Sequence, residues 1–278
     1  GGVALVDPGP STCLAHLRTT LAVQGIAVGD VRTILLTHIH LDHAGATGTL
    51  LRECPDIQVF VHERGAPHMV DPAKLLNSAT RLYGADMDRL WGEFLSVPES
   101  NVHSLGGGER IAAADRQLEV AYTPGHASHH VSFLDRASGV AFVGDTAGLR
   151  TGADLFAMPP TPPPDIDLQA WKTSILLIEQ WQAETLFLTH FGPHQGSTEH
   201  LASLREHLNG MAVMARTILE GPASDEARSD EFVAEARRYL QRHMPDTSAA
   251  LYDQAAPFEQ CWLGLARYWK KQGVGVGT

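Results

Sequence analysis

The sequence is poor in cysteine and in positive charge. Its three cysteines, Cys13, Cys54 and Cys261, lie far apart and form no CxxC pair. Neither a disulfide framework nor a thiolate zinc site is therefore indicated, and we expect a reducing, cytoplasmic location. The formal net charge of -11 argues against a nucleic-acid partner, because nucleic acids favour a basic protein face.

Long apolar runs and common hydrolase signatures are also absent from the sequence. No apolar run reaches the roughly 18 residues of a membrane-spanning helix, so we expect no membrane association. No GxSxG motif occurs, which counts against a serine hydrolase. No signal peptide is recognisable, but the chain begins Gly1-Gly2-Val3 without Met, so its start says little about targeting.

Four potential metal ligands follow one apolar run. The segment Thr37–Gly45 reads THIHLDHAG and comes directly after Ile34-Leu35-Leu36, which is typical of a short buried strand. Its ligand candidates are His38, His40, Asp42 and His43. The first two histidines lie two residues apart and point to the same side of an extended backbone, and the other two enter a helical turn. This combination indicates a site for zinc, or for iron or manganese.

The rest of the chain alternates strands and helices before a helical end. Short strands are expected up to Thr189, and residues 62–97 are predicted to be an inserted helical segment that forms a lid or packs locally. Helices are expected at about 197–220, 225–243 and 254–272. We therefore predict an α/β domain over residues 1–196 and a C-terminal helical region over 197–278. An aromatic stripe within 258–269 indicates core packing or a homodimer contact.

Three more ligand candidates stand at the ends of predicted strands. They are His126 in Thr-Pro-Gly-His, Asp145 in Gly-Asp-Thr, and His190 in Thr-His-Phe-Gly. Each follows an apolar strand and has a turn residue beside it. A lone histidine in such a place is more often structural, but here the placement recurs four times along the chain.

These motifs, in this order, resemble those of the metallo-β-lactamase superfamily, and the glyoxalase II-like hydrolases in particular. The resemblance implies an αββα sandwich of two mixed sheets flanked by helices, here with a C-terminal helical extension. It also implies that His38, His40 and His126 bind a first metal ion. Asp42, His43 and His190 would bind a second ion, and Asp145 would bridge the two.

Two adjacent divalent cations, most simply zinc, would lower the pKa of a shared water to near neutrality. The resulting bridging hydroxide would attack a small-molecule ester, thioester, lactone or phosphoester, and Asp42 would orient the nucleophile and accept its proton. The segment after Asp145 reads Ala147-Gly148-Leu149-Arg150 and lacks the Cys-Gly-Arg pattern of hydroxyacylglutathione hydrolases. A broader glyoxalase II-like hydrolase is therefore favoured.

The other histidines are expected to matter less. We predict that His130 orients a ligand or packs, and that His62 is structural. His129 and His194 are left open. The remaining histidines are expected at the surface: His16, His103, His200, His207 and His243. We also expect Phe156 and Trp91 to line an apolar pocket for the substrate.

Three alternatives to the binuclear hydrolase remain. One is a mononuclear iron oxidoreductase resembling persulfide dioxygenases, which share the opening motif. Another is a β-lactam hydrolase, which the long helical C-terminus makes less attractive. The third is a non-catalytic scaffold, which the complete ligand set disfavours because unfilled buried ligands are costly to retain.

Overall fold

Four parallel strands form the first sheet. The computed structural model describes residues 2–152 and 154–275. Strands β1 (Val3–Val6), β2 (Val31–Leu35), β3 (Gln58–His62) and β4 (Val102–Leu105) lie side by side in this order, and every neighbouring pair is parallel. The carboxyl ends of parallel strands meet at one edge of a sheet. The residues that follow β1 and β2 are therefore neighbours, although about 30 residues of chain separate them.

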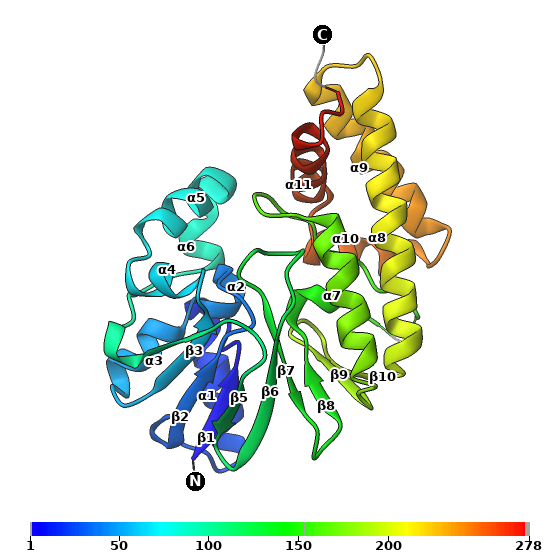
Figure 1. Cartoon of the computed structure of the whole chain (residues 1–278). Coiled ribbons are helices and arrows are strands. Elements are labelled where there is room, and N and C mark those ends of the chain that lie inside the picture. The colour runs from blue at the N-terminus through cyan, green and yellow to red at the C-terminus, as the bar shows by residue number, and fades with distance from the viewer. Residues whose placement is uncertain (1, 153, 276–278) are drawn as a thin grey trace. The chain divides into compact units, whose positions relative to one another are not determined.

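Antiparallel strands form the second sheet. Strands β5 (Arg110–Ala113), β6 (Arg116–Tyr122), β7 (Val131–Asp135) and β8 (Val140–Phe142) pair in sequence order. Short turns separate them, as the Gly-rich and polar segments of the sequence predict. Figure 1 shows β5, β6, β7 and β8 following one another in green.

The chain divides into two compact units. Unit 1 comprises the described residues up to Tyr122 together with His129–Phe142, and unit 2 comprises Thr123–Ser128 and the described residues from Val143 onward. The first sheet and strands β5 to β8 of the second sheet belong to unit 1, whereas the last two strands of the six-stranded second sheet, β9 and β10, belong to unit 2. This division does not fall at the expected domain boundary at residue 196, and that boundary stays a prediction.

Helices cover one face of the first sheet in unit 1. The α-helices of this unit are α1 (Leu14–Val23), α2 (Leu41–Ala44), α3 (Thr47–Glu53), α4 (Ala66–Val70), α5 (Ala73–Tyr83) and α6 (Met87–Leu90). Short 3-10 turns occur at Ser11–Cys13, Val28–Asp30, Gly84–Asp86 and Glu99–Asn101. Ile34 packs with residues of these helices, whereas its neighbour Leu35 packs with residues of the second sheet. This alternation is the two-residue period of a strand buried on both faces.

Unit 2 consists mainly of helices. Its elements are the 3-10 turn η5 (Gly144–Ala147), α7 (Leu168–Gln180), the antiparallel strands β9 (Thr185–Leu188) and β10 (Gly192–Gln195), α8 (Ser197–Glu220), α9 (Asp225–Gln241), α10 (Asp246–Ala255) and α11 (Phe258–Lys271). The Asp167 side chain caps α7 by accepting hydrogen bonds from the backbone N–H groups of Gln169 and Ala170.

The C-terminal helices pack against one another within unit 2, where α8, α9 and α11 lie together (Figure 1). The single helix expected over 254–272 is wrong at its start, because α10 ends at Ala255 and Pro257 precedes α11. Phe258, Cys261 and Leu265 of the aromatic stripe are buried by this packing. The stripe is therefore core, and dimerisation through these helices stays a prediction. In the described ranges, no helix combines the length and the apolar character that a membrane crossing requires.

Candidate metal centre

The histidine motif begins where β2 ends. After β2, Thr37 and His38 are fully buried, and α2 starts at Leu41 and carries Asp42 and His43 in its single turn. His38 Nε2 and His40 Nδ1 lie 3.0 Å apart, and the rings of His38 and His43 are 3.9 Å apart. His43 Nε2 lies 3.6 Å from Asp42 Oδ2. Unit 1 thus brings the four predicted ligands of the motif together.

Asp7 contacts the histidine motif, although the sequence analysis did not single it out. It follows β1, and its buried carboxylate accepts hydrogen bonds from Thr37 N at 2.8 Å, Thr37 Oγ1 at 2.7 Å and His43 Nδ1 at 3.0 Å. Because a carboxylate only accepts, His43 Nδ1 carries the proton and Nε2 presents a lone pair. The sequence carries a signal for it, since Asp7 is a carboxylate that directly follows the apolar run Val3-Ala4-Leu5-Val6.

The same chain of contacts sets the tautomer of His38. Thr37 Oγ1 donates its only proton to Asp7, so it accepts from His38 Nδ1, which is 3.1 Å away. His38 then presents the lone pair of Nε2. Metal-binding histidines commonly have their second nitrogen held in this way.

His129 and His130 lie beside the motif in unit 1. His130 is fully buried and stacks on His38 with ring centroids 5.0 Å apart. His129 Nδ1 lies 3.4 Å from the backbone N–H of Ile39 and accepts a long hydrogen bond from it. Both therefore support the motif by packing and by contact with its backbone.

Unit 2 brings the other three predicted ligands together around one carboxylate. His126 Nε2 lies 3.5 Å from Asp145 Oδ2, and His190 Nε2 lies 3.5 Å from Asp145 Oδ1. His126 Nδ1 donates to the carbonyl of Pro160 at 2.9 Å, which leaves Nε2 as the ligand atom. Asp145 thus directs one oxygen to each histidine, as a bridging carboxylate would.

Trp171 supports both His126 and the turn that holds Asp145. Its buried indole donates to the carbonyl of Thr146 at 2.7 Å, and its ring lies edge-to-face with His126 at 5.7 Å. Gly125 lets α7 approach, because a Cβ at this position would lie 2.3 Å from Cα of Trp171. The loop before His126 and the turn around Asp145 are therefore held by one side chain of α7.

His200 and His207 contradict the expectation that they lie at the surface, because both are buried on the inner face of α8. His200 Nε2 donates to the carbonyl of Ala147 at 2.8 Å, two residues after Asp145. Burial lowers the pKa of His200 to about 4, and burial followed by the charge of His243 lowers the pKa of His207 to about 4. Both side chains are therefore neutral near pH 7.

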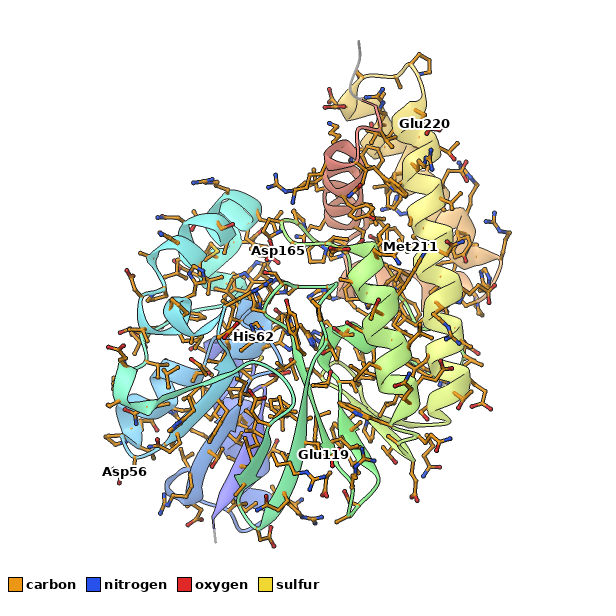
Figure 2. The ribbon with its side chains drawn as sticks, in the orientation of Figure 1. Asp56, His62, Glu119, Asp165, Met211 and Glu220 are labelled. Atoms are coloured by element: carbon orange, nitrogen blue, oxygen red, sulfur yellow. The ribbon has the colours of Figure 1, made fainter. Side chains whose placement is uncertain are left out.

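The structure also gives the surroundings of His62, His194 and Phe156, which the sequence singled out. His62 (Figure 2) is buried and stacks on Tyr122 at 4.4 Å, and burial lowers its pKa, which fits a structural role. The pKa of His194 is lowered by burial and then by the charge of Arg150. Phe156 is buried against His207, with ring centroids 3.9 Å apart. The expectation that Phe156 lines a substrate pocket was therefore wrong, because this loop side chain is buried in the core of unit 2.

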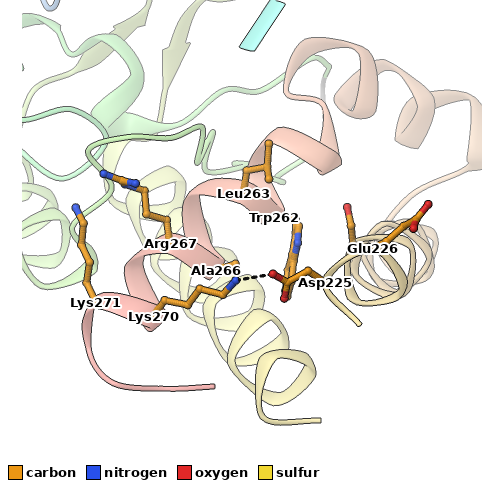
Figure 3. A pocket seen from close by; sticks show the side chains of 9 residues that line it. Asp225, Glu226, Trp262, Leu263, Ala266, Arg267, Lys270 and Lys271 are labelled. Atoms are coloured by element: carbon orange, nitrogen blue, oxygen red, sulfur yellow. Dashed lines mark hydrogen bonds and ion pairs between the residues drawn. The ribbon is translucent and has the colours of Figure 1, made fainter. Parts of the chain in front are cut away.

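One pocket of about 780 Å³ lies between α9 and α11 of unit 2 (Figure 3). Its lining includes Asp225, Trp262, Arg267 and Lys270, and Lys270 Nζ is 3.0 Å from Asp225 Oδ2. None of the predicted metal ligands lines it. Because those ligands lie elsewhere, the pocket does not supply the metal chemistry expected from the motifs.

Three of the four ligand separations match the spacing of two ligands on one divalent cation. Two ligand atoms about 2.0–2.2 Å from one tetrahedral ion lie roughly 3.3–3.6 Å apart. The pairs Asp42–His43, His126–Asp145 and Asp145–His190 fall at 3.5 to 3.6 Å, whereas His38 and His40, at 3.0 Å, lie at hydrogen-bond distance. Imidazole and carboxylate donors suit zinc, iron and manganese. Each unit thus presents ligand pairs with the chemistry and spacing for a cation.

The sequence profile of the metallo-beta-lactamase superfamily matches residues 1–190. The chain belongs to this superfamily. The structure is similar to that of the metallo-beta-lactamase family protein TTHA1429 from Thermus thermophilus, with a TM-score of 0.67 and 26% identity over 98% of this chain and 86% of that one. It is also similar to the superfamily protein ST1585 from Sulfolobus tokodaii, with a TM-score of 0.63 and 22% identity over 95% of this chain and 88% of that one. The predicted fold class, two sheets flanked by helices with further C-terminal helices, is confirmed.

Sequence relatives include a metallo-beta-lactamase fold-containing protein from Sulfurisphaera tokodaii, 30% identical over 51% of this chain and 53% of its own length. A hydroxyacylglutathione hydrolase from Legionella pneumophila (strain Lens) is 26% identical over 52% of this chain and 43% of its own length. The chain therefore spans about half the length of the curated relatives it matches.

Proposed function

We propose that the chain is a metal-dependent hydrolase with two divalent cations, most simply zinc, and a small-molecule substrate. His38, His40 and His126 would hold the first cation, Asp42, His43 and His190 would hold the second, and Asp145 would contribute its carboxylate to both. The observation that carries this proposal is the placement of Asp145, whose two oxygens each lie 3.5 Å from a different histidine nitrogen.

The contacts of the histidines support the same assignment. His38, His43 and His126 each have Nδ1 engaged by an acceptor, namely Thr37 Oγ1, Asp7 and the Pro160 carbonyl. Each therefore offers Nε2 to a cation without first losing a proton. The pairs within unit 1, His38 with His40 and Asp42 with His43, match the proposed division between the two ions.

The cations, when bound, lower the pKa of a water molecule and polarise the substrate oxygen. The chain itself supplies a proton acceptor in Asp42, whose side chain is partly exposed whereas that of His43 is fully buried. Its carboxylate orients the attacking water and takes up a proton at Oδ. Asp145 is nearly buried, so its charge is poorly screened and balances that of the cations.

The substrate class is an ester, thioester, lactone or phosphoester. Several similar proteins are named hydroxyacylglutathione hydrolase, so thioesters are the first compounds to test. The chain lacks the Cys-Gly-Arg pattern of that family after Asp145, which favours a different thioester or ester.

The test is metal analysis of the purified protein together with a hydrolysis panel of these four compound classes. Asp145→Ala lowers the metal content from about two ions per chain to one or fewer and abolishes hydrolysis. Asp115→Ala, at an exposed aspartate, is the matched control and retains both properties. Two tightly bound ions in Asp145→Ala would sink the assignment. A single iron with thiol-dependent oxygen uptake would favour the dioxygenase-like alternative instead.

A further inference from the structure

A second group of metal-ligating side chains lies where α8 and the end of α9 meet. Glu206 and His207 belong to α8, and His243 follows α9 by two residues. One ligand atom from each residue lies within 4.8 Å of the other two. All three belong to unit 2, and none is among the seven ligands of the proposed hydrolase centre. Met211, labelled in Figure 2, marks the next turn of α8 after His207.

Tyr239 holds both histidines of this group. His243 Nδ1 donates to the backbone carbonyl of Tyr239 at 2.8 Å, so its Nε2 carries a lone pair. His207 Nδ1 lies 2.8 Å from the phenol oxygen of Tyr239. The phenol oxygen can accept a hydrogen bond from Nδ1, which leaves a lone pair on Nε2 of His207. One tyrosine thus orients two imidazoles, as orienting partners of metal ligands commonly do.

His207 is also fixed by its surroundings. Its ring stacks on buried Phe156 at 3.9 Å and lies nearly perpendicular to the ring of His243 at 5.1 Å. A ligand side chain that is already ordered loses little entropy when it binds a metal.

The local charges favour a cation only if Glu206 takes part. The Arg242 guanidinium lies 5.3 Å from the centre of the Tyr239 ring and opposes a positive ligand. Glu206 supplies a carboxylate oxygen within 4.8 Å of a ring nitrogen of each of the two histidines. A carboxylate with two imidazoles offsets one guanidinium and provides a set that zinc accepts.

We propose that Glu206, His207 and His243 form an additional site for a divalent transition-metal ion, with Zn²⁺ as the probe. The bound ion joins the end of α9 to α8 and is held by three protein ligands, which leaves one position for water. The site is structural, since it contains no group that the proposed hydrolysis uses.

The test compares Zn²⁺ binding by the full-length chain and by His243→Ala, using equilibrium dialysis followed by metal analysis. His243 is exposed, so the variant is expected to fold. It binds about one ion fewer per chain than the unaltered protein, while hydrolysis is unchanged. Glu206→Gln weakens the same binding step about tenfold or more, since even partners of ligands contribute that much. The matched controls, His16→Ala and Glu231→Gln, alter exposed residues elsewhere and bind as the unaltered chain does.

The measured quantity is a difference in stoichiometry, so it does not depend on the proposed hydrolase centre. If this inference is right, adding His243→Ala to the Asp145→Ala variant again removes about one bound Zn²⁺ ion per chain. Equal Zn²⁺ content in His243→Ala and the unaltered chain overturns it. A loss of the same size in His16→Ala also overturns it, because binding would then be unspecific.

Discussion

Replacing Gly125 by Ala is expected to damage both stability and metal binding. Gly125 has a φ of +139°, which side-chain-bearing residues rarely adopt. A Cβ there would lie 2.3 Å from both Cα and Cβ of Trp171 and 2.6 Å from its backbone nitrogen. These atoms belong to the first turn of α7, which Asp167 caps, so the clash cannot be relieved by rotating a flexible side chain.

Two costs add to give the expected magnitude. Overpacking a filled interior costs about 1–3 kcal/mol. Holding an L-residue in a glycine-only backbone region costs about 1–3 kcal/mol more. The free energy of unfolding should therefore fall by about 3 kcal/mol or more. If α7 shifts to relieve the clash, Trp171 loses its contact with Thr146, and both His126 and the turn around Asp145 move.

Urea denaturation followed by tryptophan fluorescence measures the stability, and metal analysis measures the second effect. Gly29→Ala is the matched control, because nothing lies within 4 Å of a Cβ at Gly29 and its φ is not positive. The control should change stability by less than about 1 kcal/mol. A Gly125→Ala protein that is as stable as the control and keeps the metal content and kcat/KM of the unaltered chain would refute this reasoning.

Two further predictions concern the residues that support the ligands. Asp7→Ala should weaken metal binding about 10–100-fold, since His43 and Thr37 lose their shared acceptor. A competition titration with a chelator measures this loss, and Asp56→Ala at the surface should leave the affinity unchanged. An unchanged affinity in Asp7→Ala would contradict the role of Asp7. Burial lowers the pKa of His200 from 6.5 to about 4, so the unfolded chain takes up a proton between these pH values and the folded chain does not. Stability should therefore fall as the pH drops through this window, by on the order of 3 kcal/mol. Unfolding titrations of metal-free protein at several pH values should show a weaker dependence for His200→Gln, and an equal dependence would exclude His200 as the cause.

The ligand-bearing ends of strands could be predicted from the sequence because each combines two local signals. An apolar run predicts a buried strand, and a histidine or aspartate beside a turn residue marks its end. For Asp145 and His190 the signals are sharp, since β8 and β9 are short and end shortly before them. The parallel pairing of β1 with β2 is different, because it brings together residues about 30 positions apart. Asp7 also follows an apolar strand, but no local pattern marks the pairing that brings it beside Thr37 and His43, and its contacts with them were therefore missed.

The burial of His200 and His207 could have been predicted from helical spacing. Both lie on one stripe of α8 with Leu204 and Met211, at steps of four, three and four residues. We assigned them to the surface because histidine is polar, although the apolar neighbours on the stripe indicated the core. The contacts with the Ala147 carbonyl and the Tyr239 phenol show how the polar atoms are satisfied once buried.

The choice of ligand atom, in contrast, depends on residues outside the histidine motif. The motif specifies imidazoles, but an imidazole can offer either nitrogen, and the proton on the other nitrogen decides which. In this chain Asp7, Thr37 and the Pro160 carbonyl each accept a hydrogen bond from Nδ1 of a different histidine. These acceptors come from the end of β1, the residue before His38 and a proline-rich loop. We therefore expect the affinity of the proposed centre for a cation to depend as much on the packing of these segments as on the ligands that the motif names.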